Sequence, residues 1–356
     1  MKDLIKSLLP AKFVTHIWNL KQLADQSLIR IFSNANLLNR AYYFLFNKNF
    51  SFENKTVLAG RKEYYRRLKD DDYNRYLLRR NIHRLEKGMI MVPRRDLFAE
   101  KYIHETVVQF ERMSHSNKVD MSEARWANDV LESYFKMVSV TKVTSAAKVV
   151  FQKAQINLSS LNLNPTGLSI PVPSSDFKID FDVSLIEQLI LTRKSTRWFQ
   201  EKRVPENLIQ EILSVSTSAP SACNRQPYRV IALSDDETIA SVSKLASGTS
   251  GFSHQIPNLL VWIGDLSAYP YERDRHAIFI DSSLAAMQFM LLCRGHNLET
   301  CMLNWPEIRS RDHSVGKILK LKEYERVVFL MAVGFPKSEA LVPFSQKKEG
   351  VVTFKW

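Results

Sequence analysis

Two short segments of this sequence carry residue types that bind an anionic ligand. The first, Arg193-Lys-Ser-Thr-Arg197, places three cations and two hydroxyls within five residues. A guanidinium offers a planar fork of donors and an ammonium a compact charge, and both suit a phosphate group. The second, Ser218-Ala-Pro-Ser-Ala-Cys-Asn-Arg-Gln-Pro-Tyr228, holds two prolines and several small residues. It is expected to form a turn-rich loop of fixed shape.

The second segment also carries two side-chain amides, Asn224 and Gln226. Each amide offers both donors and an acceptor, so either could read the polar edge of a heterocycle. A phosphate clamp followed by an amide-bearing loop is what a mononucleotide cofactor requires. The sequence therefore predicts that the two segments together hold one mononucleotide.

The same segments resemble the nitroreductase family of FMN-dependent oxidoreductases. Arg193 to Phe199 is similar to the R-x-S-x-R-x-F segment with which those proteins open, and Ala219 to Tyr228 to the A-P-S-x-x-N-x-Q-P-W segment that follows it. The resemblance covers residues 183–356. It implies FMN as the cofactor, hydride transfer through the flavin nitrogen N5, NAD(P)H as the reductant, and a flavin site built across a homodimer interface, with the C-terminal strand exchanged between the two copies.

The resemblance also implies which residues bind the cofactor. Arg193 and Arg197 hold the phosphate and pyrimidine side, while Asn224 lies on the ring edge. A late basic pair matches the position of phosphate-binding residues in the family, although a lysine pair of no function is the open alternative. The implied set is Arg193, Lys194, Ser195, Arg197, Pro220, Ser221, Asn224, Gln226, Lys347 and Lys348.

The region that should face N5 departs from the family pattern. Family members often show G-L-G-S or G-L-D-S before a strand, and this chain has Asn297-Leu-Glu-Thr300 there. Asn304 and Trp305 then occupy the loop whose backbone N–H faces N5, which makes them the candidate catalytic residues. The indole of Trp305 either covers the pocket or fills the core. This departure argues against a typical reductase of small nitroaromatics.

The three cysteines exclude two classes of site. Cys223, Cys293 and Cys301 form no C-x-x-C pair, so neither a disulfide framework nor a zinc site is expected, and we predict no metal. Cys223 invites a nucleophile hypothesis, but no activating base accompanies it, which favours a packed small residue. A reducing compartment and the absence of a secretory signal at the N-terminus predict the cytoplasm.

The alternation of helices and strands around these segments predicts an α/β or α+β sandwich, and the resemblance implies one of nitroreductase type, with a mostly antiparallel sheet flanked by helices. Residues 1–156 read as a mainly helical domain, residues 157–181 as a linker and residues 182–356 as the FMN-binding domain. The predicted helices of that last domain are Ser184–Thr192, Pro205–Ser216, Asp235–Ala246 and Arg273–His296. Its predicted strands are Tyr228–Ser234, Asn258–Gly264, Glu299–Trp305, Arg326–Phe335 and Val351–Trp356.

One helical motif of the first half is a candidate contributor to the substrate pocket. His83, Glu86 and Lys87 share one helix face, and Gly88 suits a helix C-terminus. The segment resembles an H-x-L-E-K-G element of nitroreductase-like proteins from bacterial surface-polysaccharide gene clusters. That resemblance implies a role beside the flavin and a place in polysaccharide biosynthesis. A local salt-bridged helix end is the alternative.

The basic charge belongs to the N-terminal half. The whole chain has a net charge of +13, and residues 1–180 hold 29 Lys and Arg against 18 Asp and Glu. No nucleic-acid motif accompanies these cations, which disfavours nucleic acid as the partner. The amphipathic basic start could lie on an anionic membrane surface or dock on its own domain. An anionic, membrane-linked or glycan-linked substrate fits this charge.

Two rival functions remain open at this stage. One is a flavin-dependent dehydrogenase or desaturase that does not use NAD(P)H. The other is a non-catalytic scaffold that retained the flavin fold and binds a membrane or protein partner through its N-terminal half.

Overall fold

The structure, a computed structural model, describes residues 11–47, 50–70, 72–117, 119–159, 169–348 and 350. The chain divides into two compact units, Met1–Lys55 with Glu307–Arg309, and Thr56–Pro306 with Ser310–Trp356. The predicted boundaries at residues 157 and 182 stay predictions, since this division falls at Lys55 instead. The start of the predicted amphipathic segment and the predicted strand Val351–Trp356 lie outside the described residues.

The first unit contains a pair of helices, α2 (Ala11–Phe32) and α3 (Asn36–Leu45), and the beginning of α4 (Phe50–Lys69). Tyr42 is buried, packs against the rings of Phe32 and Phe46, and donates its hydroxyl to Asp25 over 3.0 Å. Most other large apolar side chains of the pair are exposed, among them Phe13, Ile17, Leu20, Leu23, Ile31, Leu37, Phe44 and Leu45. One aromatic cluster thus holds a helix pair that exposes much of its described apolar surface.

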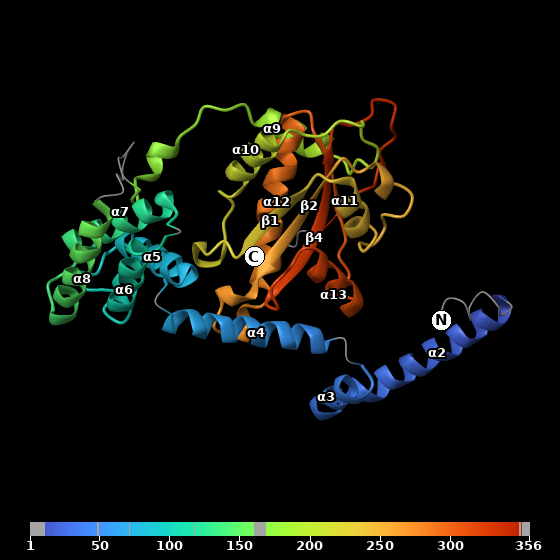
Figure 1. Ribbon diagram of the computed structural model, residues 1–356, viewed down its shortest axis with the longest axis horizontal. Coiled ribbons are helices and arrows are strands. Elements are labelled where there is room, and N and C mark those ends of the chain that lie inside the picture. The colour runs from blue at the N-terminus through green and yellow to red at the C-terminus, as the bar shows by residue number, and fades with distance from the viewer. Residues whose placement is uncertain are drawn as a thin grey trace. The chain divides into compact units, whose positions relative to one another are not determined.

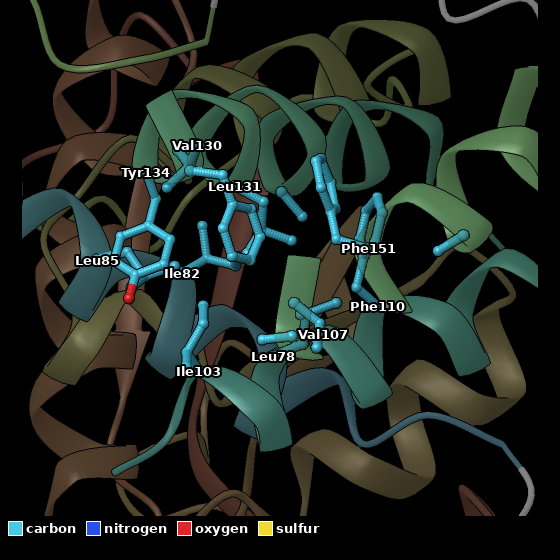
Figure 2. Packing of buried hydrophobic residues seen from close by; sticks show 14 of the residues in the cluster. Leu78, Ile82, Leu85, Ile103, Val107, Phe110, Val130, Leu131, Tyr134 and Phe151 are labelled. Atoms are coloured by element: carbon cyan, nitrogen blue, oxygen red, sulfur yellow. The ribbon is translucent and has the colours of Figure 1, made fainter. Parts of the chain in front are cut away.

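Four further helices form a bundle around one core. They are α5 (Arg75–Met89), α6 (Ile103–Ser114), α7 (Met121–Met137) and α8 (Lys142–Ser159). Side-chain caps at Asn74 and Asp120 begin α5 and α7 by accepting backbone N–H groups of the first turn. Figure 2 shows the buried side chains that meet between the helices, with Leu78, Ile82 and Leu85 on one face of α5.

Helices α4 and α5 also pack on the second half of the chain. Tyr76 donates its hydroxyl to Asp265 over 2.9 Å, and Arg61 donates Nε to the carbonyl of Pro270 over 2.9 Å. Gly60 lies against the backbone of Leu266 so closely that a Cβ there would overlap it. The helices from Thr56 onward and the sheet therefore belong to one compact unit.

The second half is a four-stranded antiparallel sheet with helices on both faces, which confirms the predicted fold class. The strands are β1 (Tyr228–Leu233), β2 (Asn258–Asp265), β3 (Glu299–Leu303) and β4 (Glu325–Gly334), in the order β1-β2-β4-β3. The helices are α9 (Val183–Thr192), α10 (Glu206–Ser216), α11 (Asp236–Ser243), α12 (Ala277–Gly295) and α13 (Arg309–Ile318). Short 3₁₀ turns complete it: η1 (Ser174–Phe177), η2 (Ala222–Asn224), η3 (Ser253–Gln255), η4 (Leu266–Ala268) and η5 (Glu272–Asp274).

Strand β2 is buried on both faces because each face is covered by helices. Leu260 and Trp262 pack with Phe289 of α12, while Val261 packs in the opposite cluster, which includes Val315 of α13. Figure 1 shows α10 and α12 on one side of the strands and α11 and α13 on the other. A central strand with no wet face explains the continuous apolar run from Asn258 to Gly264.

Helix α12 is the central helix of this layer. Together with η5 it forms the described stretch Glu272–Gly295, which is long and apolar enough to cross a bilayer by length and composition. Its buried residues, such as Ala285 and Phe289, pack on the sheet, so the composition is that of a core helix. The opposite side of α12 leaves Ile280, Leu284 and Met287 exposed.

Gly88 lies in the last turn of α5, which ends at Met89, as the sequence suggested. A Cβ at this position would overlap the ring of Phe98, which packs edge-on against Tyr134 at 5.1 Å between centroids. The glycine at this helix end is therefore also needed for the close approach of a ring.

Gly88→Ala is expected to destabilise the protein although alanine favours helix. The propensity gain of about 1 kcal/mol is outweighed by overpacking of Phe98, which costs typically about 1–3 kcal/mol. Gly316→Ala in α13 is the matched control, because nothing lies within 4 Å of its added Cβ. Compared with the wild-type protein, Gly88→Ala should unfold at a lower urea midpoint and Gly316→Ala at an equal or higher one. An equal rise of the midpoint in both variants contradicts the packing argument.

Candidate functional site

The first predicted segment follows α9 and runs beside the edge strand β3. Arg193 caps the C-terminus of α9, and the backbone of Ser195 pairs with Thr300. Thr196 donates its N–H to the carbonyl of Thr300 over 3.1 Å. The hydrogen bonds to β3 fix the backbone of this segment, so that its long cationic side chains start from a rigid edge.

These side chains line a cavity of about 280 Å³. The structure brings together five of the predicted cofactor residues here, Arg193, Lys194, Ser195, Arg197 and Lys347. The remaining lining residues are Ile190, Leu191, Pro343, Phe344 and Ser345, and none of the lining residues is acidic. Lys348 is exposed and does not line this cavity.

The positive charge of the cavity is not neutralised by ion pairs within the described chain. Arg193, Lys194 and Lys347 make no salt bridge there, and Arg197 donates only to the carbonyl of Ser195 over 3.4 Å. The nearby carboxylate of Glu299 is paired with Arg294 instead. Burial raises the pKa of Glu299, while Arg294 and Arg193 oppose that rise. A cavity with four cations and a hydroxyl suits a phosphate dianion.

The second predicted segment forms a loop with an unusual backbone. Cys223, Asn224 and Gln226 all have positive φ, at 54°, 52° and 49°. Asparagine tolerates this left-handed region, whereas cysteine and glutamine adopt it at a cost. Ser221 stabilises the loop from within, because its carbonyl accepts from Asn224 N–H and its hydroxyl from Gln226 N–H. Pro220 precedes it as an exposed residue.

A buried aspartate anchors the loop to α12. Asp281 accepts the N–H of Ala222 over 3.0 Å and the hydroxyl of Tyr269. Burial raises the pKa of Asp281, and the hydrogen bond from Ala222, the tyrosine hydroxyl and Arg225 act in the opposite direction. Cys223 is half-buried in this loop, which fits the packed small residue that the sequence favoured.

The two amides of the loop differ in what they can bind. The Asn224 side chain makes no hydrogen bond within the described chain and is half-buried, so its donors and acceptor are free for a ligand. Gln226 instead donates Nε2 to the carbonyl of Thr217 over 2.6 Å and accepts from Arg79 at Oε1 over 3.0 Å. Each end of the Gln226 amide thus has a partner that holds it in the loop, and its role at the ring edge stays a prediction.

The two segments are tied to opposite ends of α12 within one chain. Near the loop, Ala222 binds Asp281 in the first turns of α12, and just before the first segment Arg294 at the end of α12 donates to Thr192 over 3.4 Å. Thirteen residues of helix span about 20 Å. The cavity beside β3 is lined by the first segment and not by the second. The joint site therefore stays a prediction, compatible with the homodimer interface that the resemblance implies.

The region expected to face N5 is divided between surface and core. Asn304 is exposed, and its carbonyl accepts from Ser247 N–H over 3.0 Å. Trp305 is 6% exposed, packs in the core between the sheet and α13, and donates Nε1 to Asp312 over 2.9 Å. Of the two interpretations, the structure favours the core residue, so the indole does not cover a pocket.

The motif on α5 lies beside Arg79, a residue that the sequence analysis did not single out. His83 lies 3.4 Å from Glu86, whose other oxygen accepts the indole N–H of Trp126 over 2.9 Å, while Lys87 is exposed. Trp126 in turn lies under the guanidinium of Arg79. Arg79 precedes His83 by four residues and Glu86 by seven, which places the three on one helix face. That spacing was visible in the sequence.

Comparison with known proteins gives consistent matches to the second half of the chain. The model of the family described as "Nitroreductase family" matches residues 190–250 and 246–335. A protein of Methanothermobacter thermautotrophicus named putative NADH dehydrogenase/NAD(P)H nitroreductase is 35% identical over 160 residues, which are 44% of this chain and 82% of that protein. A protein of the same name from Archaeoglobus fulgidus is 27% identical over 157 residues, covering 43% and 86%.

A solved structure of the same description, from Parabacteroides distasonis, matches 49% of this chain and 100% of its own at 20% identity, with a TM-score of 0.43. The match to the Methanothermobacter protein extends over most of that protein's length, and the region matched by the family model includes both segments that first suggested the relationship. The chain belongs to the nitroreductase family.

Proposed function

We propose that this protein is an FMN-dependent oxidoreductase of the nitroreductase type. The observation that carries the proposal is the cavity beside β3, where Arg193, Lys194, Arg197 and Lys347 gather without an acidic lining residue. When bound, FMN supplies hydride transfer through its N5 atom. The protein supplies the binding, the orientation and the electrostatic surroundings of the ring.

The residues divide these tasks by their chemistry. Arg193 and Arg197 offer forked donors to the phosphate, Lys194 and Lys347 add charge, and Ser195 adds a hydroxyl, with Lys348 close in sequence. The free amide of Asn224 reads the pyrimidine edge, on the loop shaped by Pro220 and Ser221. The backbone N–H of the Asn304–Trp305 segment is the proposed donor toward N5.

The reductant and the substrate are part of the same proposal. The two archaeal relatives are named for NADH or NAD(P)H, which supports NAD(P)H as the reductant. The excess of cations in the first half favours an anionic substrate, such as a glycan linked to a phosphate carrier in polysaccharide biosynthesis. Anaerobic mixing with NAD(P)H separates this proposal from a dehydrogenase that does not use NAD(P)H. NAD(P)H bleaches the flavin absorption of a reductase, whereas the flavin of such a dehydrogenase stays oxidised and keeps its absorption.

Arg193→Ala is expected to weaken FMN binding about 10- to 100-fold, because a charge-assisted hydrogen bond contributes about 1.5–3 kcal/mol. Quenching of flavin fluorescence on titration of the apoprotein measures the dissociation constant. Lys202→Ala is the control, since Lys202 lies over the ring of Phe335 and outside the cavity. Wild-type protein that neither purifies with FMN nor quenches it contradicts the proposal and favours a non-catalytic scaffold.

We further propose that a second copy of this chain completes the site. The two segments lie about 20 Å apart along α12, so the loop of one copy must serve the cavity of the other. Helix α9 buries none of its residues, and α12 exposes Ile280, Leu284 and Met287. Covering each large apolar side chain contributes roughly 1.5–3 kcal/mol, which makes this surface a suitable homodimer interface.

Leu284→Glu is expected to produce monomers and to weaken FMN binding in the same variant. A buried unpaired carboxylate opposes association, and the monomer lacks the partner's loop. Light scattering after gel filtration gives the mass, and fluorescence quenching gives the affinity. Val149→Glu adds the same charge to an exposed position of α8 and should change neither. Monomers that keep full FMN affinity contradict the shared site.

The helix pair of the first unit is proposed to bind an anionic membrane surface. Phe13, Ile17 and Leu20 are exposed at helical spacing on α2, and Phe44 is exposed on α3. Residues 11–47 carry four Lys and Arg and a single acid, Asp25. Apolar side chains flanked by cations are the composition of helices that lie in the headgroup region of anionic bilayers. The proposal accordingly has the protein work in the cytoplasm, at the inner face of the membrane.

Flotation with vesicles tests this surface in the full chain. Wild-type protein should float with phosphatidylserine-containing vesicles and less with phosphatidylcholine alone, and Leu20→Asp with Phe44→Asp should abolish flotation. Gln26→Asp introduces the same charge on the polar side of α2 and should retain it. If the wild-type protein does not float and the double variant loses self-association, the membrane proposal is wrong, and the surface is an interface with a second copy of the chain.

A further inference from the structure

A side chain of the helical bundle makes hydrogen bonds to the loop that carries Asn224. Arg79 of α5 donates Nε to the carbonyl of Asn224 over 2.8 Å and Nη2 to Oε1 of Gln226 over 3.0 Å. Both acceptors belong to residues with left-handed backbone. The guanidinium therefore holds the loop at two of the three residues, Cys223, Asn224 and Gln226, that have positive φ.

Arg79 is itself held from the bundle side. Its Nη1 lies 3.3 Å from a carboxylate oxygen of Glu123, whose side chain is 1% exposed, and its guanidinium carbon lies 5.3 Å from the ring centre of Trp126. Trp126 is fixed by its hydrogen bond to Glu86. The Glu123 carboxylate and the face of the hydrogen-bonded Trp126 indole thus orient the guanidinium, with its remaining donors toward the loop.

The loop contacts use the particular shape of arginine. Two donors on separate nitrogens reach two acceptors while a third nitrogen keeps the carboxylate, which a lysine ammonium on a flexible stem does not reproduce. Gln226 continues the connection, because its other end donates to Thr217 just before the loop. Arg79 and Gln226 together occupy the polar groups around Asn224 and leave the Asn224 side chain unpaired within the described chain.

We propose that Arg79 is a positioning residue of the flavin site. It holds the backbone at Asn224 in the conformation that presents the free amide to the ring, so the bundle that carries it is part of the cofactor site. This rests on the proposed FMN function. It also gives the motif of His83 and Glu86 a role: the Glu86–Trp126 contact supports the aromatic face under the guanidinium.

The test is FMN affinity of apoprotein in a double-mutant cycle with Arg79→Ala and Gln226→Ala. Each single variant should bind FMN about 10-fold more weakly, and the double variant should lose little more than either one, because the two side chains act through one contact. Arg79→Lys should resemble Arg79→Ala. Added methylguanidinium should partly restore binding to Arg79→Ala and not to wild type.

Arg75→Ala is the matched control. Arg75 lies one turn earlier on α5 and binds the same Glu123 carboxylate over 2.6 Å, but its other partner is Asp120 and it makes no contact with the loop. Its removal should leave the dissociation constant for FMN unchanged. If Arg75→Ala weakens FMN binding as much as Arg79→Ala does, the bundle acts only through its stability and the positioning role is wrong.

The outcomes separate this inference from the proposed function. Wild-type protein that fails to bind FMN overturns both. Wild-type binding with unchanged affinity in Arg79→Ala, or additive losses in the cycle, overturns the positioning role alone. If Arg79→Ala shows no cooperative thermal transition, and so does not fold, Arg79→Lys replaces it in the cycle. The losses of FMN affinity must then be non-additive in the cycle of Arg79→Lys with Gln226→Ala.

Discussion

The packing of α12 on the sheet is the constraint on which the arrangement of the site depends. One side of this helix is buried against β2, β3 and β4 through residues such as Ala285 and Phe289. Its first turns anchor the Asn224 loop through Asp281, and its last turn contacts the start of the Arg193 segment through Arg294. A rigid helix cannot shorten, so the two segments proposed to bind the ligand are kept at opposite ends of α12.

The loop at the first end stores backbone strain that other contacts must offset. Residues other than glycine in the left-handed region cost on the order of 1–3 kcal/mol each, and three of them occur between Cys223 and Gln226. Hydrogen bonds to charged groups contribute about 1.5–3 kcal/mol each, and this loop has three, from Asp281 and from two nitrogens of Arg79. The summed strain and the summed contribution of these hydrogen bonds are of the same size. The loop therefore keeps its shape only while Asp281 and Arg79 are both in place.

The sequence predicted the elements of the sheet domain well, because local signals agreed with tertiary packing. Four of the five apolar runs predicted as strands are strands among the described residues, and Asp182 and Asp235 cap their helices as helix-start residues do. Helix α13 was not predicted, since only Val315 and Asp312 are buried in a stretch of charged and small residues. The sequence also grouped the four cations that line the cavity, because Arg193, Lys194 and Arg197 are nearly contiguous and Lys347 alone is distant; their binding of a phosphate stays a prediction.

Other features were beyond the sequence because they depend on which side chains meet across the fold. The amides of Asn224 and Gln226 have the same chemistry, yet packing leaves one free and gives the other two partners, Thr217 and Arg79. Gly88 lies at a helix end, as the sequence suggested, and it also admits the ring of Phe98, which no local signal shows. The residues that decide these roles lie 9 to 147 positions away in sequence. Contacts such as the one between Arg79 and Gln226 join the helical bundle to the sheet domain, so the helices from Thr56 onward are an integral part of one compact unit.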